Sequence, residues 1–292
     1  MRSVTLHSRL FGERALNYSF HSQAKSLVTK YLFTTKAGNI LGTCIFAFSI
    51  WSSYFSVVKA ETPQEVPDQL TEVIAEIENA ANEQDLDRLM EYYDSDFMNE
   101  DGLTYNTVRT ALQQMWSDYS QLTYDTEINS WEQKEDELIA ETTTIITGKK
   151  NSEGSLITLE SNLKSRQYFQ DQKLVRQEIL AEETKMFKGE NPPQIQVNVP
   201  DTVKVGERYY FDTIVTQPLE GKVLLGGAIE ERINVNLYAK PSNLELERLA
   251  AGGIFKVVTA PLLSDNHWLS AIIVGGEGVT MVTKRVRVED NI

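Results

Sequence analysis

The chain carries few residues of the types that perform covalent or metal chemistry. After residue 60 it has one histidine, His267, beside Asp265 and Trp268, and no cysteine. A Ser-His-Asp triad would need partners from elsewhere in the fold, and no nucleophile-elbow sequence is present. One histidine without cysteines cannot supply a zinc site unless several carboxylates join it. We therefore expect His267 to be a loop or strand-edge residue and Trp268 a core residue, with no metal and no cofactor.

The acidic segment from Asp94 to Gly102 is a second candidate for metal chemistry. An EF-hand loop places oxygen ligands at positions 1, 3 and 5 and a glycine at position 6. Counted from Asp94, position 5 is Met98 and position 6 is Asn99, so the motif fails. We interpret the segment as an exposed acidic turn.

Residues 1–60 have the parts of a secretory signal. Basic residues precede a short apolar run, Ile40–Trp51, and small side chains stand at Val58 and Ala60. The run is shorter than the roughly 20 residues that cross a bilayer comfortably. We expect cleavage after Ala60 and export to a bacterial periplasm or a thylakoid lumen. The alternative is an uncleaved anchor that contacts the membrane through residues 37–58.

Two other interpretations of the N-terminal segment stay open. Residues 1–36 are rich in Ser and Thr and poor in acids, as in a transit peptide. Cys44 lies in a short LGTC sequence similar to a lipoprotein box, but at the start of the apolar run, where we expect an ordinary apolar signal residue.

The charge that remains after residue 60 is strongly negative. Residues 1–60 hold seven basic residues and one acid, which leaves 21 basic and 41 acidic residues and a net charge of about −20. Such a surface repels a phosphate backbone, so nucleic acid is excluded as a partner. Without cysteines this part also has no disulfide and no thiolate catalyst.

Residues 66–188 show a helical pattern followed by a strand pattern. Apolar residues at helical spacing predict a first helix through Leu70–Ala81, a short second helix capped by Asp85, and a third helix with Val108 and Leu112 inward. Alternation then predicts strands over 122–132, 138–147, 155–165, 166–169 and 173–187. This order predicts an α+β domain with helices on one face of a curved antiparallel sheet.

Particular residues in this region carry a family resemblance. The second helix ends in a tyrosine-acid-aromatic turn, and the closing hairpin has an aromatic residue and a lysine around a polar turn. The residues are Tyr92, Tyr93, Asp94, Asp96 and Phe97 in the turn, then Phe169 and Lys173, with Leu174 where Trp is common. The pattern resembles the nuclear transport factor 2-like superfamily, the cone fold of ketosteroid isomerases and SnoaL-type cyclases. It implies a deep pocket between helices and sheet, and often a homodimer through the sheet face.

The resemblance leaves the chemistry of that pocket open, because the fold hosts enzymes and binding proteins alike. We expect Tyr93, Trp116 and Tyr119 to line it. In the alternative reading, Asp94 or Asp96 acts as a base with Tyr92 or Tyr93, as in an isomerase, hydratase or cyclase.

A second region begins after a predicted linker at residues 189–193, which contains the pair Pro192-Pro193. Residues 194–290 predict about seven short strands, the pattern of an immunoglobulin-like β-sandwich without its disulfide. The expected strands are 195–199, 207–216, 222–229, 233–238, 253–259, 268–274 and 280–288, with a short helix over 243–251.

The sequence therefore predicts an exported two-domain protein that acts by binding. We expect a hydrophobic cone pocket and a β-sandwich to take a protein partner or an apolar small molecule, without catalysis.

Overall fold

The structure is a computed structural model that describes residues 65–119, 121–152, 154–219, 221, 223–239, 244–249 and 252–290. The predicted signal or anchor, residues 1–60, lies outside the described residues. Within the described part of the chain, no helix has the length and apolar character needed to cross a membrane.

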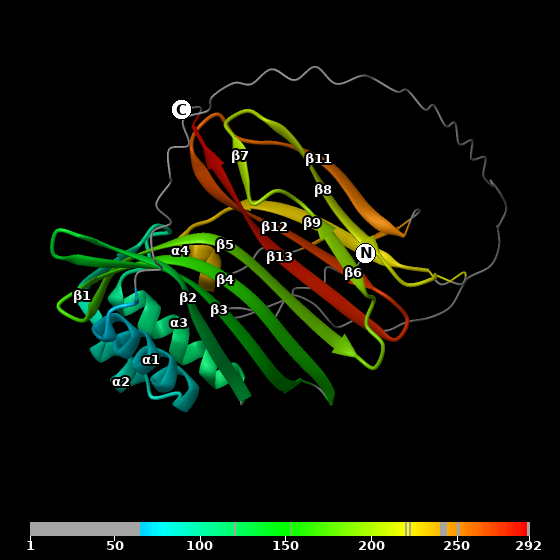
Figure 1. Ribbon diagram of the computed structural model, residues 1–292. Helices are drawn as coiled ribbons and strands as arrows, with labels where there is room; N and C mark the ends of the chain where they lie inside the picture. Colours follow the sequence, from blue (N-terminus) through cyan, green and yellow to red (C-terminus); the bar gives the residue numbers. More distant parts are fainter. Residues whose placement is uncertain are drawn as a thin grey trace, which may run out of the picture. The chain divides into compact units, whose positions relative to one another are not determined.

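Three helices open the described chain where the apolar spacing predicts them (Figure 1). Helix α1 (Asp68–Glu83) buries Leu70, Val73 and Ile74, and it ends at Gln84, a residue with a left-handed backbone. Helix α2 (Leu86–Glu91) begins at the predicted cap, because the Asp85 side chain accepts the Arg88 N–H. Helix α3 (Tyr105–Asp118) buries Met115 and Trp116.

The predicted antiparallel strands of this region form a meander. It runs through β2 (Gln121–Lys134), β3 (Glu137–Ser152), β4 (Ser155–Gln170) and β5 (Lys173–Gly189). Strand β4 is continuous where the sequence predicted two strands that meet at residue 165. A register shift between Lys164 and Ser165 keeps the strand paired with β5 across that point. Helices α1–α3 lie against one face of these strands (Figure 1).

The segment predicted as an acidic turn contains a strand. Strand β1 (Tyr93–Asn99) pairs in parallel with β5, and it buries Phe97 and Asn99 while Asp96 and Met98 are exposed. The buried residues are not all apolar, so hydrophobic alternation did not predict this strand. Asp94 still makes a local turn contact, because its Oδ1 accepts the Asp96 N–H at 2.8 Å.

The large sheet continues past β5 into the second region. Among the described residues, ten strands form this mostly antiparallel sheet, in the order β10-β9-β12-β13-β5-β4-β3-β2 with β1 and β7 at its sides. Its second half contains β9 (Leu225–Arg232), β12 (Asp265–Val274) and β13 (Gly278–Glu289), with the short strands β7 (Thr202–Lys204) and β10 (Glu247–Arg248).

A small second sheet covers the other face of this half. It consists of β6 (Ile195–Asn198), β8 (Arg208–Val215) and β11 (Gly253–Thr259), in the order β11-β8-β6. Phe211 and Ile254 of the small sheet share one buried cluster with Leu269, Ile273 and Val282 of the large sheet. The expected immunoglobulin-like sandwich is therefore not a separate unit, because one of its two layers belongs to the ten-stranded sheet.

Three expectations for the second region need correction. Residues 233–238, predicted as a strand, contain helix α4 (Val235–Ala239), because the Asn234 side chain accepts the Asn236 N–H and starts a helical turn. The predicted helix over 243–251 contains strand β10 in its described part, paired with β9. His267 lies in β12, which is paired on both sides, and not in a loop or at a sheet edge.

The predicted linker packs against the second region. Pro193 is buried, and the Thr280 hydroxyl donates to its carbonyl at 2.6 Å. Gly189 has a positive φ of 100°, and a Cβ there would lie 2.4 Å from the Glu277 carbonyl oxygen. Residues 183–189 of β5 pair with residues 278–284 of β13. Gly189, Glu190 and Asn191 are exposed and Pro192 is half-buried, so within the predicted linker only Pro193 is buried. The linker and the independent folding of the two regions stay predictions.

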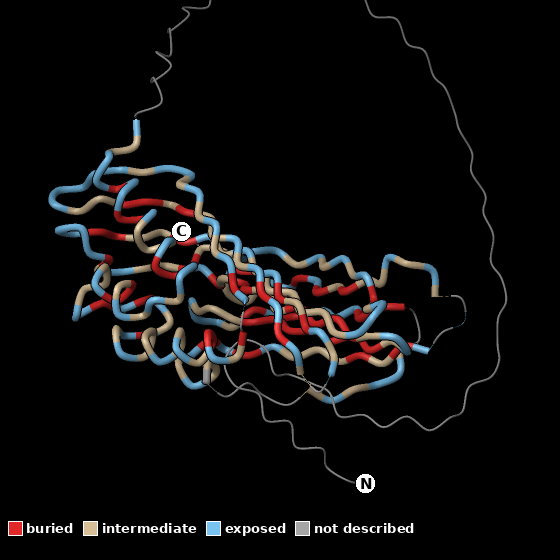
Figure 2. Tube along the Cα trace, turned by 90° about the horizontal axis from the view of Figure 1, so that it is seen from below, coloured by how far each residue is buried: buried red, intermediate tan, exposed pale blue. Residues whose placement is uncertain are grey.

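Burial follows this division into layers (Figure 2). The core has separate apolar clusters beneath the helices and beneath the small sheet. Trp268, predicted as a core residue, is 8% exposed.

Candidate functional site

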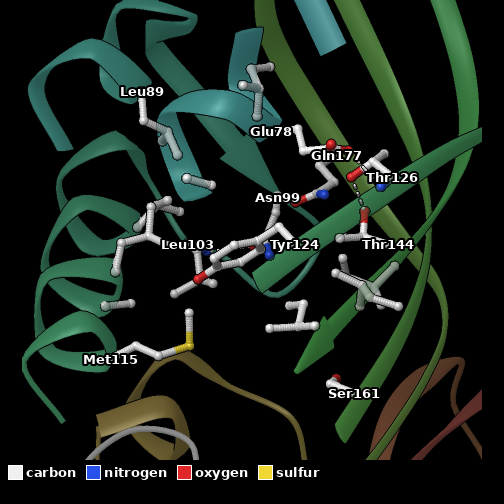
Figure 3. A pocket seen from close by; sticks show the side chains of 18 of the residues that line it. Glu78, Leu89, Asn99, Leu103, Met115, Tyr124, Thr126, Thr144, Ser161 and Gln177 are labelled. Carbon is white, nitrogen blue, oxygen red and sulfur yellow. Dashed lines mark hydrogen bonds between the residues drawn. The ribbon is translucent and has the colours of Figure 1, made fainter. Parts of the chain in front are cut away.

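A cavity of about 230 Å³ lies between the helices and the β2–β5 half of the sheet (Figure 3). Helices α1 and α3, the segment just before α3 and the inner face of the strands line it mostly with apolar side chains. They include Ile74, Ile77, Leu103, Val108, Leu112, Met115, Ile146 and Leu163. The helical and strand periods that fold this region also turn these residues inward, so the cavity is apolar for the same reason that the region folds.

Hydroxyl groups interrupt the apolar lining on the sheet side. Thr126 of β2 and Thr144 of β3 are directly paired, and their hydroxyls lie 3.1 Å apart. Ser161 of β4 and Thr184 of β5 form a second pair at 2.8 Å. Because each hydroxyl already has a partner on its neighbouring strand, these groups are satisfied without a ligand.

Helix α1 holds the edge strand β2 by two side chains one helical turn apart. Asn82 accepts the Tyr124 N–H at 2.8 Å and donates to the Tyr124 carbonyl at 2.9 Å. Glu78 accepts the Thr126 N–H through Oε2 at 2.6 Å. These contacts satisfy backbone groups that an edge strand otherwise leaves open, and they also place the Glu78 carboxylate in the wall of the cavity.

Two phenol groups lie in the apolar part of the wall. The indole N–H of Trp116 donates to the Tyr124 hydroxyl at 2.9 Å, which leaves the Tyr124 proton to be donated elsewhere. Burial raises the pKa of Tyr93 to about 12 and raises the pKa of Tyr124 well above its usual range. Both phenols are therefore neutral hydrogen-bond donors near pH 7.

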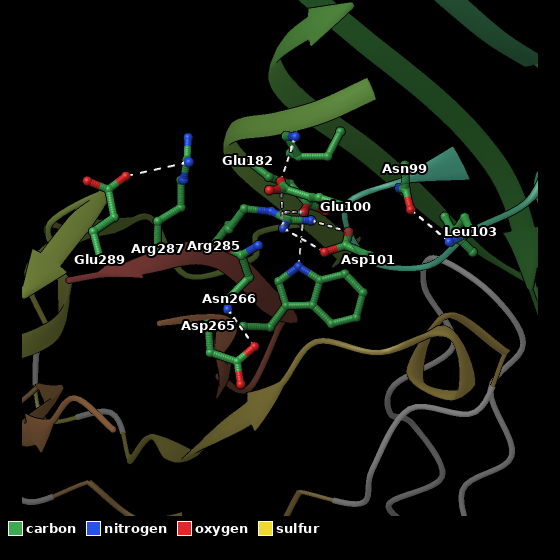
Figure 4. Close-up of polar contacts among 12 residues, drawn as sticks. Asn99, Glu100, Asp101, Leu103, Glu182, Asp265, Asn266, Arg285, Arg287 and Glu289 are labelled. Atoms are coloured by element: carbon green, nitrogen blue, oxygen red, sulfur yellow. Dashed lines mark hydrogen bonds and ion pairs between the residues drawn. The ribbon is translucent and has the colours of Figure 1, made fainter. Parts of the chain in front are cut away.

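A buried charge cluster lies where the two halves of the sheet meet (Figure 4). Arg285 of β13 is fully buried and makes a two-pronged contact with Asp101, at 3.0 and 2.7 Å. Its Nε lies 3.4 Å from Glu182 Oε2, which also accepts the Trp268 indole N–H at 2.9 Å. Tyr238 of α4 donates its hydroxyl to Asp101 and stacks edge-on against Trp268.

Opposing effects decide the charge states in this cluster. Burial alone would lower the pKa of Arg285, but the hydrogen bond to Asp101 and the charges of Glu182 and Asp101 raise it, so the guanidinium stays charged. Burial raises the pKa of Tyr238, which therefore stays neutral. Burial also raises the pKa of Glu100, against the nearby charge of Arg285.

Two members of this cluster line the cavity, and one of them belongs to the second region. Glu182 and Tyr238 are part of the cavity wall. Glu182 comes from β5, whereas Tyr238 comes from α4, in the region predicted as a separate sandwich. The cavity is therefore completed by the second region.

The structure separates the residues that the sequence placed in one site. Tyr93 lines the cavity, whereas Trp116 and Tyr119 are buried outside its lining, in the cluster with Leu122. Asp94 and Asp96 lie in the first half of β1 and are not part of the wall. The Tyr92 hydroxyl lies 3.4 Å from Glu76 Oε2, also outside the lining.

The carboxylates and phenols of the wall are mostly residues that the sequence analysis did not select. Glu78 lies on α1 next to the apolar positions Ile77 and Ala81, and Tyr124 lies on the same face of a predicted strand as Leu122, so both had a periodic signal that could have found them. Tyr238 had none, because the contact of α4 with the cavity wall joins residues far apart in the sequence.

Comparisons with known proteins find weak similarities. A family model described as "Domain of unknown function (DUF8623)" matches residues 190–289. No curated protein matches the chain.

Solved structures that are similar to part of the chain include SnoaL-like folds. IdmH of Streptomyces antibioticus, a proposed polyketide cyclase, is 14% identical, with 37% of this chain and 88% of that chain covered and a TM-score of 0.32. A proposed SnoaL-like polyketide cyclase of Shewanella putrefaciens is 14% identical over 40% of this chain and 80% of that chain, with a TM-score of 0.31. Bd1075 of Bdellovibrio bacteriovorus is 18% identical, with 38% of each chain covered and a TM-score of 0.29.

Proposed function

We propose that the protein binds a small, largely apolar molecule in the cavity without changing it chemically. The observation that carries this proposal is the cavity of about 230 Å³ between helices and sheet. An engineered apolar cavity of about 150 Å³ binds benzene, so this volume suits an apolar ligand larger than benzene. An empty space of this size lowers stability by lost contacts, and a ligand would restore them.

The contacts of the cavity carboxylates favour binding over catalysis. A general base needs a carboxylate that is free to take a proton from the substrate. Glu182 already accepts the Trp268 indole N–H and pairs with Arg285. Glu78 holds the Thr126 N–H with one of its oxygens.

Binding can be tested by filling the cavity. Ala111 of α3 lines it, so Ala111→Leu adds three carbon atoms to the space while keeping a good helix former. The probe is N-phenyl-1-naphthylamine, whose fluorescence rises in an apolar site. We expect the wild-type protein to bind it and Ala111→Leu to bind at least roughly tenfold more weakly.

The matched control is Gln113→Leu, which adds the same side chain on the exposed face of the same helix. It should bind the probe as the wild type does. Equal binding by Ala111→Leu and the wild type, in proteins of equal thermal stability, would refute the cavity as the binding site.

A second candidate function is a proton-transfer enzyme. Glu78 shares the apolar wall with Tyr93 and Tyr124, which is the combination of carboxylate and phenol that an isomerase or cyclase uses. Such an enzyme should lose turnover by several powers of ten in Glu78→Gln while keeping its ligand affinity. Asp94→Asn and Asp96→Asn should leave either function nearly intact, because neither residue reaches the cavity.

Export and self-association are proposals that rest on the sequence. Mass spectrometry of the native protein should give an N-terminus at Glu61; peptides from residues 20–50 would indicate an anchor instead. A homodimer through the outer sheet face would be polar, because Arg166 pairs there with Glu141 and Glu178.

A further inference from the structure

The charges in the cavity wall are unbalanced. Of the described residues that line the cavity, two are carboxylates, Glu78 and Glu182, and none is Lys, Arg or His. A carboxylate in an apolar wall is unfavourable unless a cation or several hydrogen bonds compensate it. The two carboxylates differ in whether the protein itself compensates their charge.

Glu182 is compensated within the protein. Arg285 is fully buried beside it, and the Trp268 indole N–H donates to the same carboxylate oxygen. A ligand cation near Glu182 would also meet the charge of Arg285. Glu182 is therefore a poor partner for a charged ligand.

Glu78 lacks a cationic partner in the described part of the chain. Its one hydrogen bond there is the Thr126 N–H, which binds Oε2 and leaves Oε1 available. The neighbouring basic residue on this side, Arg88, pairs with Glu76 and Glu83 instead. The charge of Glu78 is thus the uncompensated charge of the cavity.

The groups next to Glu78 are hydrogen-bond acceptors as well. Thr126 and Thr144 hold one another, and each hydroxyl oxygen keeps a lone pair for a further donor. Figure 3 shows Glu78, Thr126 and Thr144 at one end of the view, with Met115 at the other. A ligand that fits both ends needs a donor-rich, positive group and an apolar body.

We propose that the ligand is a small apolar amine, bound as its ammonium form with the cationic group on Glu78. The inference rests on the proposed binding function and specifies its ligand class. The ammonium pairs with Oε1 of Glu78 and donates to the hydroxyl pair of Thr126 and Thr144. The apolar body packs against the α1 and α3 residues of the wall. The net charge of about −20 after residue 60 attracts a cation and repels an anion.

The first experiment compares three ligands with one skeleton: benzylamine, benzyl alcohol and benzoate. Each displaces N-phenyl-1-naphthylamine from the wild-type protein at pH 7. We expect benzylamine to bind at least roughly tenfold more tightly than benzyl alcohol, since a hydrogen bond to a charged group is the stronger kind. Benzoate should bind most weakly.

The outcomes separate this inference from the binding function. Equal or tighter displacement by benzyl alcohol or benzoate would overturn the amine, while the cavity would remain a binding site. The same holds if the probe binds in an Ala111-dependent way and none of the three ligands displaces it. Absence of probe binding to the wild type would overturn both proposals.

The second experiment removes the charge alone. Glu78→Gln keeps an oxygen that can accept the Thr126 N–H, so β2 stays attached to α1. It should lower benzylamine affinity by roughly tenfold or more and leave benzyl alcohol unchanged. The matched control is Glu72→Gln, which makes the same charge change at an exposed position of the same helix. An equal loss of benzylamine affinity in both variants would refute a specific contact with Glu78.

Discussion

The two halves of the large sheet are covered in different ways. Helices α1–α3 cover β2–β5 and leave a cavity of about 230 Å³. The small sheet covers β12 and β13 with a filled core, in which Ile273 is 0% exposed and Leu269 and Val282 are each 1% exposed. The strands differ accordingly: β12 is apolar at almost every buried position, whereas the cavity strands carry Thr126, Thr144 and Ser161 inward.

This difference shows where the protein keeps space for another molecule. A protein interior is normally packed to the density of an organic crystal, so an unfilled space costs stability. The half formed by β12, β13 and the small sheet shows that this chain can build a close-packed core. In the half that contains the cavity, small polar side chains face inward at positions where a close-packed core would have Leu or Ile.

The two halves meet at the charge cluster of Arg285, Asp101 and Glu182. Each half supplies a part: Asp101 and Glu182 come from the first region, and Arg285 and Trp268 from the second. Because Glu182 and Tyr238 are also cavity residues, a change at this junction reaches both the core and the binding site.

Removing the arginine at the junction should have the largest effect. Arg285→Ala leaves Asp101 and Glu182 buried without their cation, which should lower the free energy of unfolding by about 3–5 kcal/mol. Denaturant unfolding followed by circular dichroism measures the loss. The matched control is Arg232→Ala, since Arg232 pairs with Asp265 while its side chain is 73% exposed; it should cost about 0–1 kcal/mol. Similar losses in both variants would show that the junction is not a special point of stability.

Truncation in the two halves should give unequal losses. Ile273→Ala opens a void in a filled core and should cost about 2–5 kcal/mol. Leu163→Ala enlarges a space that already exists, so its cost should lie near or below the lower end of that range. The same unfolding assay compares them. A larger loss at Leu163 would mean that the cavity half is the tighter-packed one.

The smallest effect should come from pH at the junction. Burial raises the pKa of Glu100, whose side chain is 19% exposed, above its ordinary value of 4.5. A raised folded-state pKa contributes stability that is present below pH 4.5 and is lost as the pH rises through the raised pKa. Glu100→Gln should therefore gain stability relative to wild type between about pH 4.5 and pH 7, because it never ionises.

Thermal unfolding at the two pH values measures this gain. Glu160→Gln, at an exposed position of β4, is the control and should show no such dependence. A Glu100→Gln variant that loses stability relative to wild type as the pH rises would reverse the assigned sign.

Much of the first region follows from local patterns. The three helices and β2–β5 lie close to the predicted ranges, because 3.6-residue and two-residue periods record which face of each element is buried. The Asp85 cap was also correct, since capping depends on neighbouring residues alone. The strand β1 and the helix α4 were missed. Apolar and polar residues alternate over 233–237, which also fits a strand, and the acidic residues of β1 also fit an exposed turn. In each segment the packing against other elements selects the structure.

The candidate site follows less directly from local patterns. Tyr93 lines the cavity, whereas Trp116 and Tyr119 do not, because periodic spacing shows that a side chain faces inward without showing whether it meets a cavity or a packed core. Asp94 and Asp96 were selected for their chemistry, but they lie in β1 outside the wall.

The sequence alone determined the order of helices and strands, the charge after residue 60 and the apolar character of the inner faces. Each depends on residue types or on periods of two to four residues. Only the tertiary structure decided that β13 pairs with β5, that Arg285 meets Asp101 and that Tyr238 completes the cavity. Residues 89 to 184 positions apart form these contacts, and no local period records which distant segments meet.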